Sequence, residues 1–348
     1  MSPKKIGKDL LCRLLEAQVR RLRRRNDFVI VAVAGSVGKT STKLAIAASQ
    51  ASRKQVICQN GNYNDRLTVP LVLFGHTEPG IYDIPAWIRI LLANQRALRH
   101  AYPYDIAVLE LGTDKPGQLA DFAYLKPDLS VITAVAPEHM EFFGTVDAVA
   151  EEEMVPLAFS KRALLNLDDI AAQYIPRAPH HTYGENQTAE YRLIDSKQEG
   201  LHGQQLEIGL GEAVLRLSTP LLGKPGAKII LAAAATADLF GWPLDAIKTG
   251  LAAIRPVSGR MRTLPGISGT TLIDDTYNSS PSAVKAALDV LYQTQTSQRI
   301  CILGDMNELG GQSPAEHQAV GDYCDPKKLD LVVTIGAESR KSLAPAAE

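Results

Sequence analysis

From residue 29 onward, short runs of Val, Ile and Leu alternate with longer segments of helical periodicity. FVIVAVAG at residues 28–35 predicts a buried strand, and TSTKLAIAASQAS at residues 40–52 predicts the helix that follows it. Further buried strands are predicted at residues 105–112 and 129–135, with a weaker one at residues 162–169. Apolar runs separated by helices in this way are typical of a parallel sheet with helices on both faces.

The pattern changes between residues 186 and about 222, where short alternating strands are separated by glycine turns. We interpret this stretch as an antiparallel β extension of the parallel sheet. Apolar residues at helical spacing then predict a buried helix over residues 228–241 and another helix over residues 243–254.

A stretch rich in Pro, Gly and Ser at residues 255–269 marks a domain boundary. Strand-like and helix-like segments alternate again beyond it, and the third strand-like run, at residues 329–336, lies close to the end of the sequence. We therefore predict an α/β fold with a central domain at residues 28–258 and a smaller Rossmann-like α/β domain at residues 259–348. The second domain is short, possessing fewer strands than a doubly wound domain usually has.

Residues 1–27 form a separate basic segment, predicted to be an amphipathic helix. Its apolar residues recur at helical spacing, and five arginines follow or interleave them, namely Arg20, Arg21, Arg23, Arg24 and Arg25. One interpretation is a weak contact with an anionic membrane surface. The interpretation that we favour is a helix docked on the next domain, because the apolar stripe is short and contains no Trp or Phe.

The overall composition, 45% hydrophobic and 22% charged, is that of an ordinary globular protein. A formal net charge of −1 provides no general attraction for nucleic acid. The four cysteines are scattered without metal-ligand spacing, which favours reduced thiols. No apolar run reaches the ~18 residues of a membrane span, and no signal peptide is visible. We expect a cytoplasmic protein that acts as a monomer.

The sequence GSVGKTS after the first predicted strand has the spacing of a phosphate-binding loop, which makes the central domain a P-loop domain. Glycines allow backbone amides to approach phosphate oxygens, and the following helix directs its positive end to the same place. Lys39 is expected to reach the β- and γ-phosphates, and the Thr40 hydroxyl to bind Mg²⁺. The predicted nucleotide contacts are Gly35, Ser36, Val37, Gly38, Lys39, Thr40 and Ser41. The loop alone leaves a GTPase, a kinase and a ligase open.

Further motifs occur in a specific order after the loop. They are N-x-N at residues 62–64, E-L-G at residues 110–112, P-E-H at residues 137–139, G-R at residues 259–260, and D-D-T-Y-N and G-D-M-N-E-L-G at residues 274–278 and 304–310. In this order they resemble the Mur ligases, the ATP-dependent amide ligases of peptidoglycan precursor synthesis. The chain is most similar to the branch that adds D-alanyl-D-alanine to UDP-N-acetylmuramoyl-tripeptide.

The resemblance implies ATP and Mg²⁺ as cofactors, a cell-wall precursor as substrate, and a reaction through an acyl phosphate. It implies that Thr40 and Glu110 bind one Mg²⁺ ion, that His139 binds a second, and that Arg260 reaches the γ-phosphate. Further nucleotide contacts implied in this way are Asn62, Asn64, Asn166, Asp168, Asp275, Tyr277 and Asn278. Structural interpretations remain open for several of these residues: an ion pair at a strand end for Glu110, a turn for Asn166, and packing for Tyr277.

The chain departs from the family pattern at three places. Where many Mur ligases have a carbamylated lysine that binds the second Mg²⁺, this sequence has Glu153, next to Glu152. We predict that one of these carboxylates replaces the lysine, and we choose Glu153; an exposed acidic helix start is the alternative. The adenine-binding segment has Pro225 and Ile229 in place of His and Asn. The usual N-terminal domain that holds the UDP group is expected to be missing. These departures keep a non-catalytic, Mur-like binding protein as the alternative function.

Overall fold

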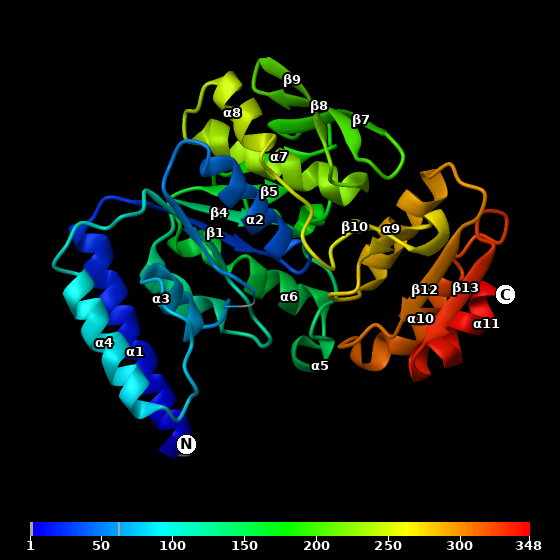
Figure 1. Cartoon of the computed structure of the whole chain (residues 1–348). Coiled ribbons are helices and arrows are strands. Elements are labelled where there is room, and N and C mark those ends of the chain that lie inside the picture. Colours follow the sequence, from blue (N-terminus) through cyan, green and yellow to red (C-terminus); the bar gives the residue numbers. More distant parts are fainter. Residues whose placement is uncertain (1–2, 62) are drawn as a thin grey trace.

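The computed structural model describes residues 3–61 and 63–348. Within these residues, a nine-stranded sheet forms the centre of the molecule, in the order β2-β3-β1-β4-β5-β6-β7-β8-β9 (Figure 1). The strands run parallel from β2 to β7, whereas β7, β8 and β9 pair antiparallel. The strands are β1 (Val29–Ala34), β2 (Val56–Cys58), β3 (Ile106–Glu110), β4 (Leu129–Ile132), β5 (Ala163–Asn166), β6 (His181–Gly184), β7 (Tyr191–Gln198), β8 (Gln204–Leu210) and β9 (Ala213–Thr219).

The parallel part of this sheet is buried on both faces, as the continuous apolar runs predict. Val31 and Val33 of β1 pack into one layer with α2 (Lys39–Gln50), α7 (Gly223–Leu239) and α8 (Leu244–Leu251). Ile30 and Ala32 point to the opposite layer, which contains α3 (Thr68–Leu73) and part of α1 (Pro3–Arg25). The predicted strands, the helix after the loop and the antiparallel extension are thus present.

The remaining α-helices of the central domain are α4 (Ile84–Ala97), α5 (Met140–Phe143) and α6 (Val146–Glu153). The sequence analysis does not identify α4, which lies beside α1 at one side of the sheet (Figure 1). The α1 helix is docked, as favoured above: Val19 and Leu22 join the core beneath the sheet, and Cys12 and Leu15 pack with Trp87 of α4. Within the described residues, no helix has the length and apolar character needed to cross a membrane.

The C-terminal region is the short α/β unit that the sequence predicts, with its strands divided between two small pairs. Its helices and strands are β10 (Arg262–Pro265), β11 (Thr271–Asp274), α9 (Pro281–Gln293), β12 (Ile300–Gly304), α10 (Ser313–Gly321), β13 (Leu331–Ile335) and α11 (Ala344–Ala347). β10 and β11 form an antiparallel pair, and β12 and β13 form a separate parallel pair. Cys301 faces the small core beneath the β12–β13 pair, while Ile302 and Ile335 are exposed on its other face. Helices cover only one face of the β12–β13 pair, so the face that carries Ile302 and Ile335 is exposed to solvent.

We predict that Leu109→Ala in β3 lowers the free energy of unfolding by about 2–5 kcal/mol, because the side chain is fully buried and its removal leaves a cavity. Leu10→Ala is the matched control, since Leu10 is 59% exposed, and it should change stability by less than about 0.5 kcal/mol. Urea unfolding followed by circular dichroism measures both. Equal losses in the two variants would contradict the assignment of the core.

Candidate active site

The phosphate-loop sequence lies between β1 and α2, at the carboxyl end of the parallel strands. Gly35 (φ 117°) and Gly38 (φ 86°) both have positive φ values that favour glycine. A Cβ atom on Gly35 would lie 2.4 Å from the Thr133 hydroxyl oxygen. Gly38 directly precedes α2, so the loop amides and the positive end of the helix meet at one place. This combination is typical of an anion-binding site.

The loop is held by the segment that follows β4. The Thr133 hydroxyl donates to the carbonyl oxygen of Val37 at 2.6 Å. The amide of Ser36 donates to the carbonyl of Ala134, and the Ser36 hydroxyl accepts from the amide of Ala136. These bonds fix the loop backbone without any ligand, so its conformation is determined by the protein itself.

Lys39, the first residue of α2, is paired with a carboxylate. Its ammonium group lies 3.1 Å from Glu138 Oε1. Burial would lower the pKa of Lys39, but the nearby carboxylates of Glu138, Glu153 and Glu110 outweigh it and the pKa is raised. Lys39 is therefore charged, and its partner in the structure is the Glu138 carboxylate.

Glu153 lies directly against the loop. Its Oε2 accepts from the Gly35 amide at 2.6 Å, and its Oε1 is buried without a hydrogen-bond partner in the described residues. Burial raises the pKa of Glu153 to about 8, opposed by Lys39 and assisted by the charge of Glu138. The carboxyl group is thus largely protonated at neutral pH. Its predicted role as a Mg²⁺ ligand stays a prediction.

Glu110 ends β3 and is held on both sides. Its backbone exchanges two hydrogen bonds of 2.8 Å with the side chain of Gln59. Asn64 donates to Glu110 Oε1 at 3.1 Å, and the fully buried ammonium of Lys43 lies 3.4 Å from Oε2. Asn62, the other asparagine of the N-x-N motif, lies outside the described residues.

These residues have the chemistry of a Mg²⁺ site. Glu110 Oε2 is buried and accepts no hydrogen bond from the described residues, and Thr40 and Ser41 lie half-buried in the first turn of α2. Carboxylate and hydroxyl oxygens are the ligands that Mg²⁺ prefers. Glu110 and Thr40 therefore fit the first predicted ion.

His139 and Glu153 contact different residues. Its Nε2 is 3.5 Å from Asp114 Oδ1, and its Nδ1 is 2.9 Å from Oε2 of Glu308 in the C-terminal domain. Glu152, the alternative carboxylate, accepts from the amides of Gly117 and Leu119 and so stabilises the loop after β3. Among the described residues, no three His, Cys, Asp or Glu side chains form a group that could hold a metal ion. The second ion and its ligands therefore stay a prediction.

Asn166 and Asp168 organise the end of β5. Asn166 donates to the carbonyl of Thr133 at 2.8 Å and to Asp169 at 2.7 Å. Asp168 accepts from the amides of Glu185 and Asn186. Through Thr133, Asn166 is linked to the phosphate loop, although it makes no contact with the loop itself.

The predicted C-terminal residues gather where the two domains join. The Arg260 guanidinium stacks 4.1 Å from the centre of the Tyr277 ring, and Asp275 accepts from the amide of Met261. Tyr277 is half-exposed, and the Asn278 side chain accepts from the next amide in the chain. Arg260 is thus held by its own domain, and its predicted contact with the γ-phosphate stays a prediction.

Sequence reasoning missed Glu138, Lys43 and Gln59. Glu138 directly precedes His139 in the P-E-H motif, and Lys43 lies one helical turn after Lys39, so the spacing of both was available. Nothing in the sequence signals Gln59, because its role depends on β2 lying beside β3.

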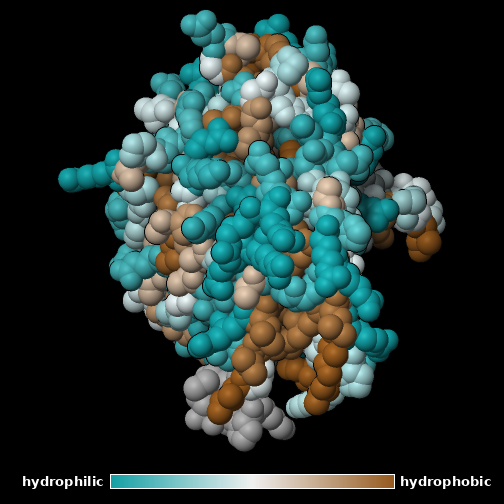
Figure 2. Space-filling view, turned by 90° about the vertical axis from the view of Figure 1, so that its left-hand side faces the viewer, coloured by the Kyte–Doolittle hydropathy of each residue, from teal (hydrophilic) through white to brown (hydrophobic). Residues whose placement is uncertain are grey.

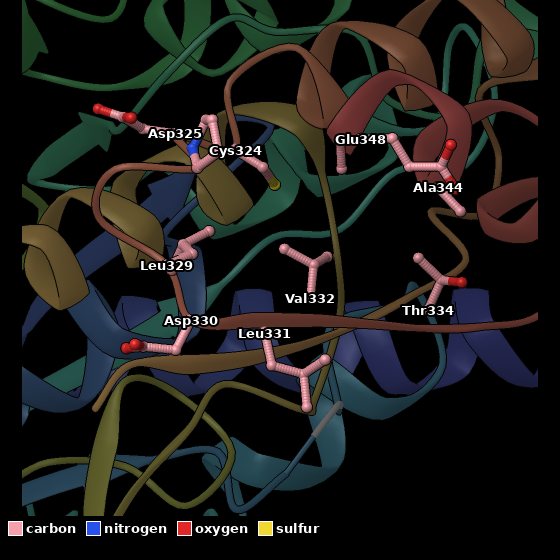
Figure 3. A pocket seen from close by; sticks show the side chains of 11 residues that line it. Cys324, Asp325, Leu329, Asp330, Leu331, Val332, Thr334, Ala344 and Glu348 are labelled. Atoms are coloured by element: carbon pink, nitrogen blue, oxygen red, sulfur yellow. The ribbon is translucent and has the colours of Figure 1, made fainter.

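A cavity of about 290 Å³ lies elsewhere, in the C-terminal domain (Figure 3). Leu331, Val332 and Thr334 of β13 line it together with Cys324 and the end of the chain. None of the predicted site residues lines this cavity, so we do not assign it to the active site.

The parallel sheet, the glycine loop and the helix that starts at Lys39 define the class: an α/β protein with a P-loop. Family models extend this assignment. The Mur ligase middle domain matches residues 89–237, and the Mur ligase glutamate ligase domain matches residues 259–348. The chain belongs to the Mur ligase family, of which it contains these two domains.

Individual relatives agree with the family models. The UDP-N-acetylmuramoyl-tripeptide–D-alanyl-D-alanine ligase of Escherichia coli is 29% identical over 323 residues, which cover 89% of this chain and 65% of the relative. The crystal structure of MurF from Acinetobacter baumannii matches 98% of this chain and 70% of its own, with a TM-score of 0.81 and 22% identity. MurF of Thermotoga maritima in complex with ADP matches 97% of this chain and 84% of its own, with a TM-score of 0.73 and 21% identity. The chain thus spans about two thirds of the length of its E. coli relative.

Gly35→Ala should disrupt the loop, because the added Cβ meets Thr133 and the positive φ is strained. We expect a loss of about 3 kcal/mol or more in stability and at least a tenfold loss of affinity for a fluorescent ATP analogue. Gly200→Ala is the control: Gly200 also has a positive φ, but no atom lies near the added Cβ. This variant should lose about 1 kcal/mol of stability and bind nucleotide like the wild type. Unchanged nucleotide binding in Gly35→Ala would contradict the proposed loop geometry.

The pH dependence of stability tests the environment of Glu153. Its pKa is raised from 4.5 to about 8 in the folded protein, so the folded state retains a proton that the unfolded state loses. Its stabilising contribution is complete below about pH 4.5 and is lost as the pH rises through about 8. Relative to Glu153→Gln, the wild type should therefore lose stability across this window in urea unfolding. Glu151→Gln, an exposed neighbour, is the control, and a pH-independent difference for Glu153→Gln would refute the shift.

Proposed function

We propose that this protein is an ATP-dependent amide ligase that acts on a peptidoglycan precursor. In the proposed reaction, ATP phosphorylates a carboxylate of a muramoyl peptide, and the amine of D-alanyl-D-alanine or a similar compound attacks the acyl phosphate and releases phosphate. The observation that carries the proposal is the preformed phosphate loop with Lys39 and Glu110 beside it, in a chain of the Mur ligase family.

Each residue has a role in this reaction. The loop amides and the start of α2 bind the phosphates of ATP, and Lys39 leaves Glu138 to contact the transferred phosphate group. Glu110 and Thr40 hold Mg²⁺, which would supply positive charge to offset the crowded phosphate and carboxylate oxygens. Asn64 and Lys43 orient the Glu110 carboxylate. Arg260 approaches the γ-phosphate when the domains close, which requires it to turn away from Tyr277.

We also propose the finer features expected from the sequence: a monomer in the cytoplasm that contacts an anionic membrane surface weakly, with domains divided at residues 27/28 and 258/259. The break in the family matches between residues 237 and 259 supports the second boundary. The four cysteines, which are free thiols in the structure, are compatible with a reducing compartment.

A non-catalytic, Mur-like nucleotide-binding protein is the second candidate. It is supported by one observation, namely that Glu153 contacts Gly35 whereas His139 contacts Asp114 and Glu308, so the two residues expected to bind the second Mg²⁺ have different partners.

The deciding measurement is phosphate release from ATP and Mg²⁺, with and without UDP-muramoyl-tripeptide and D-alanyl-D-alanine. We expect release that requires both substrates and falls by at least a hundredfold in Lys39→Ala, because the phosphate loses its charged partner. Lys197→Ala, an exposed lysine of β7, should retain full activity. Binding of ATP without any release, with these substrates present, would favour the non-catalytic protein.

A further inference from the structure

Helices α1 and α4 form a parallel pair at one side of the central domain. Gln18 donates to the carbonyl of Leu91 at 2.9 Å, and Arg21 donates to the side chain of Gln95 at 3.2 Å. The separation of 74 residues between Arg21 and Gln95 sets the register of the pair. Leu10 is therefore level with Ile84, and Leu14 with Ile88.

The side of the pair that faces away from the protein is apolar at its amino-terminal end. Each helix has three exposed apolar residues at a spacing of four, and together they form what we call the α1–α4 patch: Ile6, Leu10, Leu14, Ile84, Ile88 and Leu92. Leu10 is 59% exposed and Ile84 is 66% exposed. Figure 2 shows a continuous hydrophobic area low on this face, with hydrophilic side chains above it. A patch of six large apolar residues in contact with water calls for a partner.

The same two helices are strongly basic. Their sequences contain eleven Lys and Arg and two acidic residues, a net charge of +9 in a chain whose net charge is −1. Both acidic residues, Asp9 and Glu16, are bound by Arg66 of the central domain. Among the described residues, no carboxylate forms an ion pair with the exposed arginines of the pair and its end, which are Arg21, Arg24, Arg25, Arg89, Arg96 and Arg99.

We propose that the α1–α4 patch binds the surface of an anionic lipid bilayer, with the apolar residues at the level of the acyl chains and the arginines at the lipid phosphates. An apolar stripe beside a basic face is what an interfacial helix requires, and here two helices in fixed register double its area. The interaction extends the membrane contact suggested by α1 alone, because the most apolar side of α1 is already buried against the protein.

A second copy of the chain is a poorer partner for this surface. In a symmetric dimer the same surface meets itself, so one helix pair with a net charge of +9 would lie against another of the same charge. Like charges brought together in this way oppose association, whereas anionic lipid headgroups neutralise them. The charge of the pair therefore favours a membrane.

Flotation of the full-length protein with lipid vesicles tests the proposal. Vesicles of phosphatidylcholine with roughly 30% phosphatidylglycerol should bind the protein at least tenfold more strongly than pure phosphatidylcholine, and binding should weaken on going from about 0.1 M to about 0.5 M salt. The double variant Ile84→Glu/Ile88→Glu should lose at least tenfold in binding. Ile267→Glu, at an 87% exposed position of the C-terminal domain, is the matched control and should bind like the wild type.

Binding of a fluorescent ATP analogue, together with circular dichroism, establishes that each variant is folded, and neither readout depends on the proposed ligase activity. No binding of the wild type to anionic vesicles at low salt would overturn the proposal, as would equal binding of Ile84→Glu/Ile88→Glu. A concentration-dependent dimer in analytical ultracentrifugation that the double variant abolishes would also overturn it, because the patch would then be an interface between two copies.

Discussion

The close approach of Gly35 to the segment after β4 is the constraint on which the site depends. With no side chain at Gly35, the loop lies against Thr133, which in turn holds the carbonyl of Val37. This contact fixes where the loop turns into α2 and therefore where Lys39 begins the helix. Since β1 and β4 are neighbours in the parallel sheet, the position of the loop follows from the burial of the sheet itself. The contact between Gly35 and Thr133 thus contributes both to the stability of the domain and to the proposed phosphate binding.

The lysine and glutamate side chains around the loop largely neutralise one another. The half-buried Lys39 and the fully buried Lys43 lie among the carboxyl groups of Glu110, Glu138 and Glu153. Three ionised carboxylates would leave one negative charge uncompensated, and burying an unpaired charge is costly. The raised pKa of Glu153 removes that charge by retaining a proton. In the proposed function, an incoming phosphate would replace Glu138 as the partner of Lys39, and the hydrogen bonds that hold the loop would not need to change.

The two ends of the chain contribute surfaces of different character. The α1–α4 pair is fixed to the central domain by a small core around Trp87, so its outer apolar residues are displayed on a rigid support. Glu308 of the C-terminal domain contacts His139 of the central domain, the residue predicted to bind the second Mg²⁺. The same histidine therefore takes part in the domain contact and in the predicted chemistry, which links domain position to the site.

The sequence by itself determined the parallel sheet, the antiparallel extension and the phosphate loop, because apolar runs and the G-x-x-G-K-T spacing are local features. It also identified Glu110 and Asn64, which the structure brings within 3.1 Å of each other. Tertiary structure decided which carboxylates approach the loop. Glu153 accepts from the amide of Gly35, a contact that no local pattern indicated, and its role as a Mg²⁺ ligand stays a prediction. Lys43 and Gln59 contact Glu110 only because α2 and β2 lie beside β3. Helix α4 is likewise held in place by its packing on α1. Such contacts join residues distant in sequence, so no local pattern encodes them.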